Sequence, residues 1–224
     1  MPGGRTSLYF DLLDGFNQPS CPICRFALRA VGRFFDALTY ENTNDPNVRR
    51  GVRAARGFCN RHTQQYVALG DELGAAIIYR DLLHTIIPAL GEAAPDGFAD
   101  VAGALTDPDG EHLADHALRA LAPEDVCYAC QRQRESEDHY LSTLVQHLGT
   151  KEFTAAYERS AGLCAVHVEP ALRACRDQGR RDLLVGLQRR SWQALLERLE
   201  RDEPDDATLR AALTAAVGGQ GIRP

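Results

Sequence analysis

Apolar residues recur at helical spacing along most of this chain. The clearest stretch covers residues 21–40, where successive apolar positions lie four residues apart: Phe26, Ala30, Phe34 and Leu38. This spacing places them on one face of an α-helix. A shorter amphipathic stretch at residues 7–17 predicts a helix before it, and residues 42–47 interrupt the pattern after it.

Capping residues divide the rest of the first half into further helices. Asp45 followed by Pro46 is typical of an N-cap and a first helical turn, which predicts a short helix over residues 46–56. Gly57 is placed to end that helix in a left-handed conformation. A third helix is then predicted from Cys59 through to Leu83.

The second half of the chain repeats this plan. A long helix is predicted from Cys127, a short one over residues 151–161, and the next from Cys164, with Gly162 in the place of Gly57. A packing helix over residues 183–199 and a terminal helix over 206–217 follow. The repetition predicts an all-α fold made of a duplicated helical unit in a pseudo-twofold arrangement.

Each copy carries the same set of cysteine and histidine residues. A C-x-x-C pair begins the long helix and a C-x-x-H pair begins the third helix. Three thiolates and one imidazole make a full tetrahedral shell for a borderline-soft cation. We therefore predict eight metal ligands in two sites: Cys21, Cys24, Cys59, His62, Cys127, Cys130, Cys164 and His167.

Both ligand pairs of each copy fall at predicted helix starts, so helix N-termini are expected to converge on the two metal sites. Three thiolates on a divalent ion leave a net charge of about −1, which free backbone N–H groups and the helix dipole favour. A complete shell leaves no open position for water or substrate. Such closed sites are typical of structural metals, and no catalytic residue is predicted.

Two zinc ions are the predicted cofactors. Iron–sulfur clusters are the alternative, because a histidine can replace a thiolate ligand in such centres, and the spacing does not separate the two. The cysteines could also be packed as small apolar residues, or each C-x-x-C could form a redox disulfide. A redox C-x-x-C is typical of a βαβ context, which this pattern does not show.

The assignment of ligands to ions is also open. We expect each copy to hold its own ion, but the long helix rises about 30 Å and the short helix returns only about 16 Å at 1.5 Å per residue. The loop must supply the remaining span. The cross-copy arrangement, in which Cys21 and Cys24 meet Cys164 and His167, therefore remains an alternative.

The predicted domain ranges follow the repeat. Residues 1–90 form the first metal-binding repeat with its N-terminal helix, and residues 91–126 form an acidic linker with short helices. Residues 127–203 form the second repeat, and residues 204–224 form a C-terminal helix and tail. The linker prediction depends on three prolines and an excess of acidic residues.

Composition and charge narrow the setting. The 224 residues are 44% hydrophobic with a net charge of −6, which is typical of a soluble globular protein and argues against general nucleic-acid affinity. Residues 21–70 hold eight arginines against three acidic residues, so an Arg-rich nucleic-acid face on the first repeat remains an alternative. No apolar run has the length of a membrane helix, and no signal-peptide core is present. We expect a cytoplasmic protein that binds no membrane.

Several segments resemble an uncharacterised prokaryotic family. They are Leu8-Tyr-Phe-Asp-Leu-Leu, Cys21-Pro-Ile-Cys, Leu38-Thr-Tyr-Glu-Asn-Thr-Asn-Asp-Pro and Gly57-Phe-Cys-Asn-Arg-His. Members of the family carry the doubled cysteine pattern over a span like residues 7–200. The second copy departs from the pattern with Tyr128-Ala129 where Pro-x is expected. The resemblance implies ligand roles for the eight residues and supplies no activity.

The function predicted from these features is a metal-binding, non-enzymatic binding or adaptor protein with an unknown protein partner. An iron–sulfur redox or electron-transfer protein and a nucleic-acid-binding protein are the alternatives. The sequence assigns neither the partner nor the oligomeric state.

Overall fold

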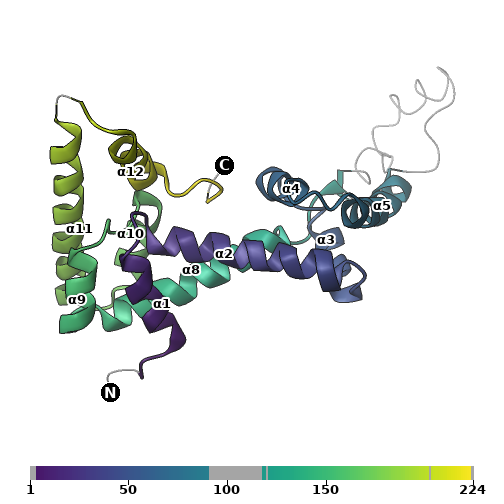
Figure 1. The fold of residues 1–224 in the computed structure, drawn as a ribbon. Helices are drawn as coiled ribbons and strands as arrows, with labels where there is room; N and C mark the ends of the chain where they lie inside the picture. The colour runs from purple at the N-terminus through teal and green to yellow at the C-terminus, as the bar shows by residue number, and fades with distance from the viewer. Residues whose placement is uncertain (1–3, 91–117, 120, 202, 223–224) are drawn as a thin grey trace, which may run out of the picture. The chain divides into compact units, whose positions relative to one another are not determined.

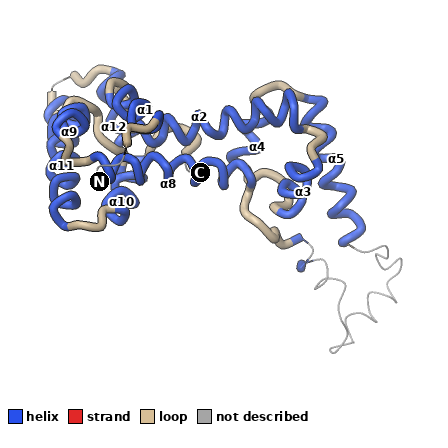
Figure 2. Tube along the Cα trace, turned by 90° about the horizontal axis from the view of Figure 1, so that it is seen from below, coloured by secondary structure: helices blue, strands red, loops and turns tan. Residues whose placement is uncertain are grey.

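A computed structural model describes residues 4–90, 118–119, 121–201 and 203–222. These residues form α-helices, one π-helical turn at Leu38–Asn42 and loops, and they contain no strand (Figure 1 and Figure 2). The predicted all-α class is confirmed. No helix in these ranges is long and apolar enough to cross a membrane. The duplication and the pseudo-twofold arrangement stay predictions.

The chain forms two compact units that do not follow the sequence repeat. Unit 1 comprises residues 1–33 and 132–224, and unit 2 comprises residues 34–131. Helices α2 (Pro22–Ala37) and α8 (Tyr128–His147) each contribute residues to both units. The domain ranges predicted from the sequence repeat stay a prediction; they are 1–90, 91–126, 127–203 and 204–224. Residues 91–117 and 120 of the predicted linker lie outside the described residues.

Unit 1 is built around one buried cluster of apolar side chains. It contains α1 (Ser7–Phe16), α9 (Lys151–Glu158), α10 (Ala165–Ala174), α11 (Gln178–Leu199) and α12 (Asp206–Val217). Helix α1 packs on α9, and α11 packs on α9, α10 and α12 (Figure 1). The rings of Phe16 and Phe153 meet edge to face at 5.1 Å, and the sulfurs of Cys21, Cys24 and Cys164 belong to the same core. The cysteines of this unit are therefore part of its interior.

Unit 2 has an aromatic core of its own. It contains α3 (Pro46–Ala54), α4 (Asn60–Val67) and α5 (Glu72–Ala89), and α5 packs on both α3 and α4. The ring centroids of Phe35, Phe58 and Tyr66 lie 5.3–5.7 Å apart in a mutually packed group. As predicted, Asp45 caps α3: its carboxylate accepts the backbone N–H groups of Asn47 and Val48 at 2.8 and 3.0 Å.

The single helix predicted from Cys59 to Leu83 is two helices, α4 and α5. Gly70 adopts a φ of +73°, in the left-handed region that ends helices. Asp71 then caps α5 by accepting the backbone N–H of Gly74 at 2.9 Å. Leu69 and Leu73 continue the apolar spacing on either side of this break although their side chains are exposed, so periodicity alone does not reveal the break.

Candidate metal centres

The eight predicted ligands come together in two clusters, one in each unit. The unit 1 cluster comprises Cys21, Cys24, Cys164 and His167, and the unit 2 cluster comprises Cys59, His62, Cys127 and Cys130. In each cluster one ligand atom from every residue lies within 4.8 Å of the other three. All seven cysteines of the chain are free thiols, so neither C-x-x-C pair forms a disulfide.

The clusters form across the two sequence copies. The C-x-x-C of the first copy meets the C-x-x-H of the second in unit 1, and the converse holds in unit 2. The structure does not bring the four ligands of one copy together, which corrects the expectation that each copy holds its own ion. Helix α2 has 16 residues and rises about 24 Å over its whole length, whereas α3 has nine and returns about 14 Å.

Helix N-termini supply the ligands of both clusters. Cys59 and Cys164 are the N-cap residues of α4 and α10 and have extended backbone angles. Cys24 lies in the first turn of α2, and Cys127 directly precedes α8. The first backbone N–H groups of each helix have no partner within the helix, so they and the helix dipole favour negative charge on these sulfurs.

A glycine precedes each C-x-x-H pair, as the sequence predicts for a sharp corner between helices. Gly57 and Gly162 have φ values of +97° and +70°. A Cβ on Gly162 would lie 2.9 Å from Nε2 of Gln188, so both backbone conformation and space favour glycine there. These corners turn Cys59 and Cys164 toward their clusters.

Distances in the unit 1 cluster fit a single tetrahedral ion. The sulfurs of Cys24 and Cys164 are 3.5 Å apart, and Nδ1 of His167 lies 3.2–3.6 Å from the three sulfurs. A zinc ion bound at about 2.3 Å to sulfur and about 2.0 Å to nitrogen spaces its tetrahedral ligands about 3.5–3.8 Å apart. The four atoms therefore fit one such ion.

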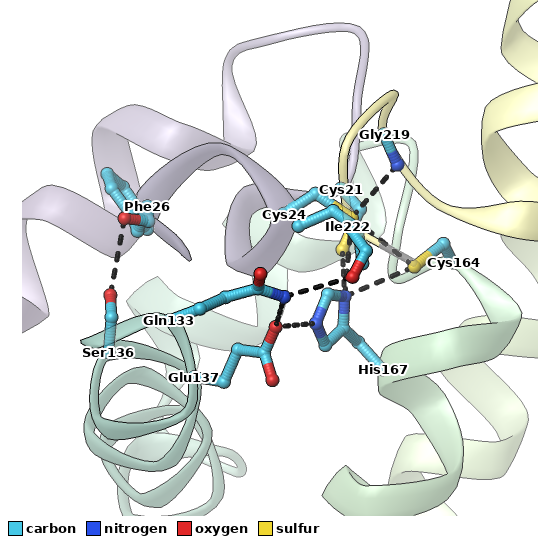
Figure 3. Close-up of polar contacts among 10 residues, drawn as sticks. All are labelled: Cys21, Cys24, Phe26, Gln133, Ser136, Glu137, Cys164, His167, Gly219 and Ile222. Carbon is cyan, nitrogen blue, oxygen red and sulfur yellow. Dashed lines mark hydrogen bonds and ion pairs between the residues drawn. The ribbon is translucent and has the colours of Figure 1, made fainter. Parts of the chain in front are cut away.

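The imidazole of His167 is oriented from its far side. While Nδ1 faces the sulfurs, Nε2 lies 3.4 Å from Oε1 of Glu137 on α8 (Figure 3). The side-chain amide of Gln133 donates to the same oxygen at 2.7 Å. A carboxylate behind a ligand histidine fixes the tautomer and raises the basicity of the ligand nitrogen. Glu137 and Gln133 thus support the ligand role of His167.

The C-terminal segment of the chain also contacts the unit 1 cluster. The backbone N–H of Gly219 donates to Sγ of Cys24 at 3.3 Å (Figure 3). The carbonyl of Ile222 accepts the amide of Gln133 at 3.1 Å, and the Ile222 side chain is buried. The cluster is therefore bonded to a segment far from its ligands in the sequence.

The unit 2 cluster has similar internal spacing. Nδ1 of His62 lies 3.3–3.5 Å from its three sulfurs, and the sulfurs of Cys59 and Cys130 are 3.7 Å apart. The Arg61 guanidinium donates to Sγ of Cys130 at 3.8 Å. This set also fits one tetrahedral ion. Unlike the cysteines of unit 1, Cys59 and Cys130 are partly exposed.

The shifted pKa values in the unit 1 cluster indicate that its side chains can exchange protons for a bound cation. Burial raises the pKa of the Cys21 thiol well above its usual range, whereas hydrogen bonds from Cys21 and Cys24 lower the pKa of Cys164. Burial lowers the pKa of His167, but the sulfurs of Cys164 and Cys24 outweigh burial and raise it to about 11. Without a metal, the cluster carries protons that a divalent ion would replace.

Three features of this site were missed in the sequence prediction: Glu137 with Gln133, the C-terminal segment, and Gln188. Gln188 is buried on α11, where it accepts the backbone N–H of Leu163 at 2.9 Å and donates to its carbonyl at 3.0 Å. It thereby holds the residue before Cys164. A weak signal existed for Gln133 and Glu137, which are polar residues four apart on one face of the predicted long helix.

Three arginines of the first copy form ion pairs within unit 2. Arg49 and Arg53 on α3 contact the carboxylate of Asp81 on α5 at 2.7 and 2.6 Å. Arg56 contacts Glu124 at 2.9 Å. These pairs reduce the net positive charge available to a phosphate backbone. Nucleic-acid binding by this repeat stays a prediction with no added support.

Comparison with known proteins agrees with the resemblance to an uncharacterised family. The model of the Family of unknown function (DUF6062) matches residues 8–202. The "Uncharacterized 23.9 kDa protein in xynA 3'region" of Caldicellulosiruptor sp. (strain Rt8B.4) is 24% identical over 197 residues, which cover 85% of this chain and 84% of that protein. No solved structure matches. The chain belongs to the Family of unknown function (DUF6062).

Proposed function

We propose that this protein holds two structural zinc ions, one in each unit, and acts as a non-enzymatic binding or adaptor protein. The observation that carries the proposal is the closure of each cluster, in which three sulfurs and one nitrogen lie within 4.8 Å of one another. Cys21, Cys24, Cys164 and His167 would hold one ion, and Cys59, His62, Cys127 and Cys130 the other. A zinc ion supplies fixed tetrahedral geometry and no redox chemistry.

Ligand spacing favours a single ion over an iron–sulfur cluster. A cluster distributes its protein ligands over several iron atoms, so ligands on different irons lie further apart than those on one ion. The separation of 3.5 Å between the sulfurs of Cys24 and Cys164 and that of 3.7 Å between those of Cys59 and Cys130 match ligands on one ion.

A structural role follows from the filled ligand shell. Four protein ligands leave no position for substrate, and the buried sulfurs of unit 1 form part of its core. Thiolate ligands stay reduced in a cytoplasm-like compartment, which suits this chemistry. A helical scaffold pinned at two points is suited to presenting a fixed surface to a protein partner.

Anaerobic purification followed by elemental analysis and a visible absorption spectrum tests the metal assignment. We expect a colourless protein with two equivalents of zinc. A brown protein containing iron and sulfide would replace zinc with the iron–sulfur alternative. A metal-free protein with the same circular dichroism before and after chelation would contradict a structural metal altogether.

A further inference from the structure

We propose that the two centres differ in how readily they exchange their metal. The unit 1 centre is locked by the C-terminal segment, and the unit 2 centre is open to exchange with an external thiolate or carboxylate ligand. This inference rests on the proposed function, since it requires metal in both clusters. On this proposal, the unit 2 centre is the one that takes up metal from, or gives it to, an external ligand.

Exposure of the sulfurs is the first observation behind this difference. In unit 1 the exposed fractions are 4% for Cys21, 2% for Cys24 and 1% for Cys164. In unit 2 Cys59 and Cys130 are partly exposed. An incoming ligand must reach the ion or its sulfurs before a protein ligand leaves, so burial slows exchange at unit 1.

The C-terminal segment Gly218–Ile222 adds a second barrier at unit 1. Gly218 has a φ of +85°, which turns the chain sharply where α12 ends. The backbone N–H of Gly219 then bonds to Sγ of Cys24, and the Ile222 side chain, 2% exposed, anchors the far end of the segment.

Two hydrogen bonds and one ion-pair contact connect this segment to His167. The Gln133 amide donates to the carbonyl of Ile222 at 3.1 Å and to Glu137 at 2.7 Å, and Glu137 lies beside Nε2 of His167 (Figure 3). Detaching the segment therefore removes a donor from Cys24 and loosens the group that orients His167. Groups of this kind change metal affinity by about 10–100-fold.

The unit 2 cluster is contacted differently. The donor to its Cys130 sulfur is the side chain of Arg61, which is itself partly exposed. A guanidinium beside partly exposed thiolates offsets part of their negative charge, which reduces the repulsion of an anionic ligand. A thiolate or carboxylate acceptor therefore matches both the charge and the metal chemistry of this centre.

Stopped-flow metal release from the zinc-loaded wild-type protein tests the inference. A carboxylate chelator in excess is added together with iodoacetamide, and peptide mass spectrometry follows alkylation over time. We expect two phases of one zinc each, with the first at least about tenfold faster. Peptides containing Cys59, Cys127 and Cys130 should be labelled in the first phase, and those containing Cys21, Cys24 and Cys164 in the second.

Two changes in the C-terminal segment test whether its contacts slow metal release from unit 1. Ile222→Ala, and separately a chain ending at Val217, should accelerate the second phase by about 10–100-fold and leave the first unchanged. Leu213→Ala, which alters an exposed apolar side chain on α12, is the matched control and should change neither phase.

Release of both ions at one rate, or earlier labelling of the unit 1 cysteines, would overturn the inference while leaving the two structural zinc ions intact. An unchanged second phase in both segment variants would overturn the role of the lock. If the purified wild-type protein holds no stoichiometric metal, the proposed function fails first. The wild-type labelling order decides the main claim even where a variant does not fold.

Discussion

At the scale of single residues, Glu137 influences the metal-binding chemistry of His167 without belonging to the cluster itself. Its carboxylate lies 3.4 Å from Nε2 of His167 and, with a metal bound, would favour the single imidazole proton on that nitrogen, away from the sulfurs. Nδ1 is then left with a lone pair for the metal. The Gln133 amide holds the carboxylate in this position.

Glu137→Ala should weaken metal binding at unit 1 by about 10–100-fold, because the imidazole loses the group that fixes its tautomer and orientation. Equilibrium competition with a coloured zinc chelator measures the change. Glu135→Ala is the matched control, since this residue lies two positions from both Gln133 and Glu137, on another side of α8, and pairs with Arg132. If the Glu137→Ala and Glu135→Ala variants bind their two zinc ions with the same affinities, Glu137 does not have this role.

At the scale of helices, Asp81 joins α5 to α3. Hydrogen bonds from Arg49 and Arg53 outweigh the effect of burial, which raises the pKa of this carboxyl, and hold its pKa below its usual range. A carboxyl with a lowered pKa in the folded state stabilises the fold at pH values above its unfolded pKa of about 3.9. That contribution is lost as the pH falls through the folded-state pKa.

Asp81→Asn should therefore lower the free energy of unfolding by about 1 kcal/mol at pH 7. The difference from wild type should shrink as the pH falls below about 4 toward the folded-state pKa, because the wild-type carboxyl then becomes uncharged like the Asn side chain. Urea titrations at several pH values measure both effects. Asp36→Asn, at an exposed position on α2, serves as the control. A difference that stays constant down to the lowest pH would argue against the ion pairs as its cause.

Local helix signals were predicted well because their causes are local. Asp45 caps α3 with its own side chain, and Gly57 takes the left-handed conformation expected of it. The break at Gly70 was missed because the apolar spacing in the sequence continues through Leu69 and Leu73 on either side of it. A glycine within a periodic pattern is often tolerated inside a helix, so the pattern alone does not decide between the two outcomes.

At the scale of the whole chain, the grouping of ligands can be tested by combining substitutions. Cys21→Ser with Cys164→Ser removes two ligands of one centre, so the double variant should lose one zinc equivalent, as each single variant does. Cys21→Ser with Cys59→Ser removes one ligand from each centre and should lose two. Elemental analysis of the purified variants gives the count.

The pattern of losses separates the two groupings. If Cys21 and Cys59 shared an ion, their double variant would lose one equivalent, and the pair Cys21 and Cys164 would lose two. A dilute chelator is included during purification so that centres lacking a ligand do not retain a weakly bound ion. The wild-type protein purified in the same way is the control.

The eight residues that the structure gathers into two clusters could be selected from the sequence because their residue types and spacing are typical of metal ligands. Their grouping could not, since it depends on how far each helix carries the chain. Within a copy, α2 and α3 differ in length and do not bring the four ligands back together. Buried contacts such as Gln188 with Leu163 join distant segments and leave no periodic trace in the sequence.

The interleaving of the two copies fixes an order of completion during protein synthesis. The centre in unit 2 has all its ligands once Cys130 has been made, whereas the centre in unit 1 waits for His167 although its first ligand is Cys21. The contact between Gly219 and Cys24 forms later still. Each emerging chain therefore passes through a stage in which one candidate metal site has all four of its residues and the other has only the two cysteines of its C-x-x-C pair.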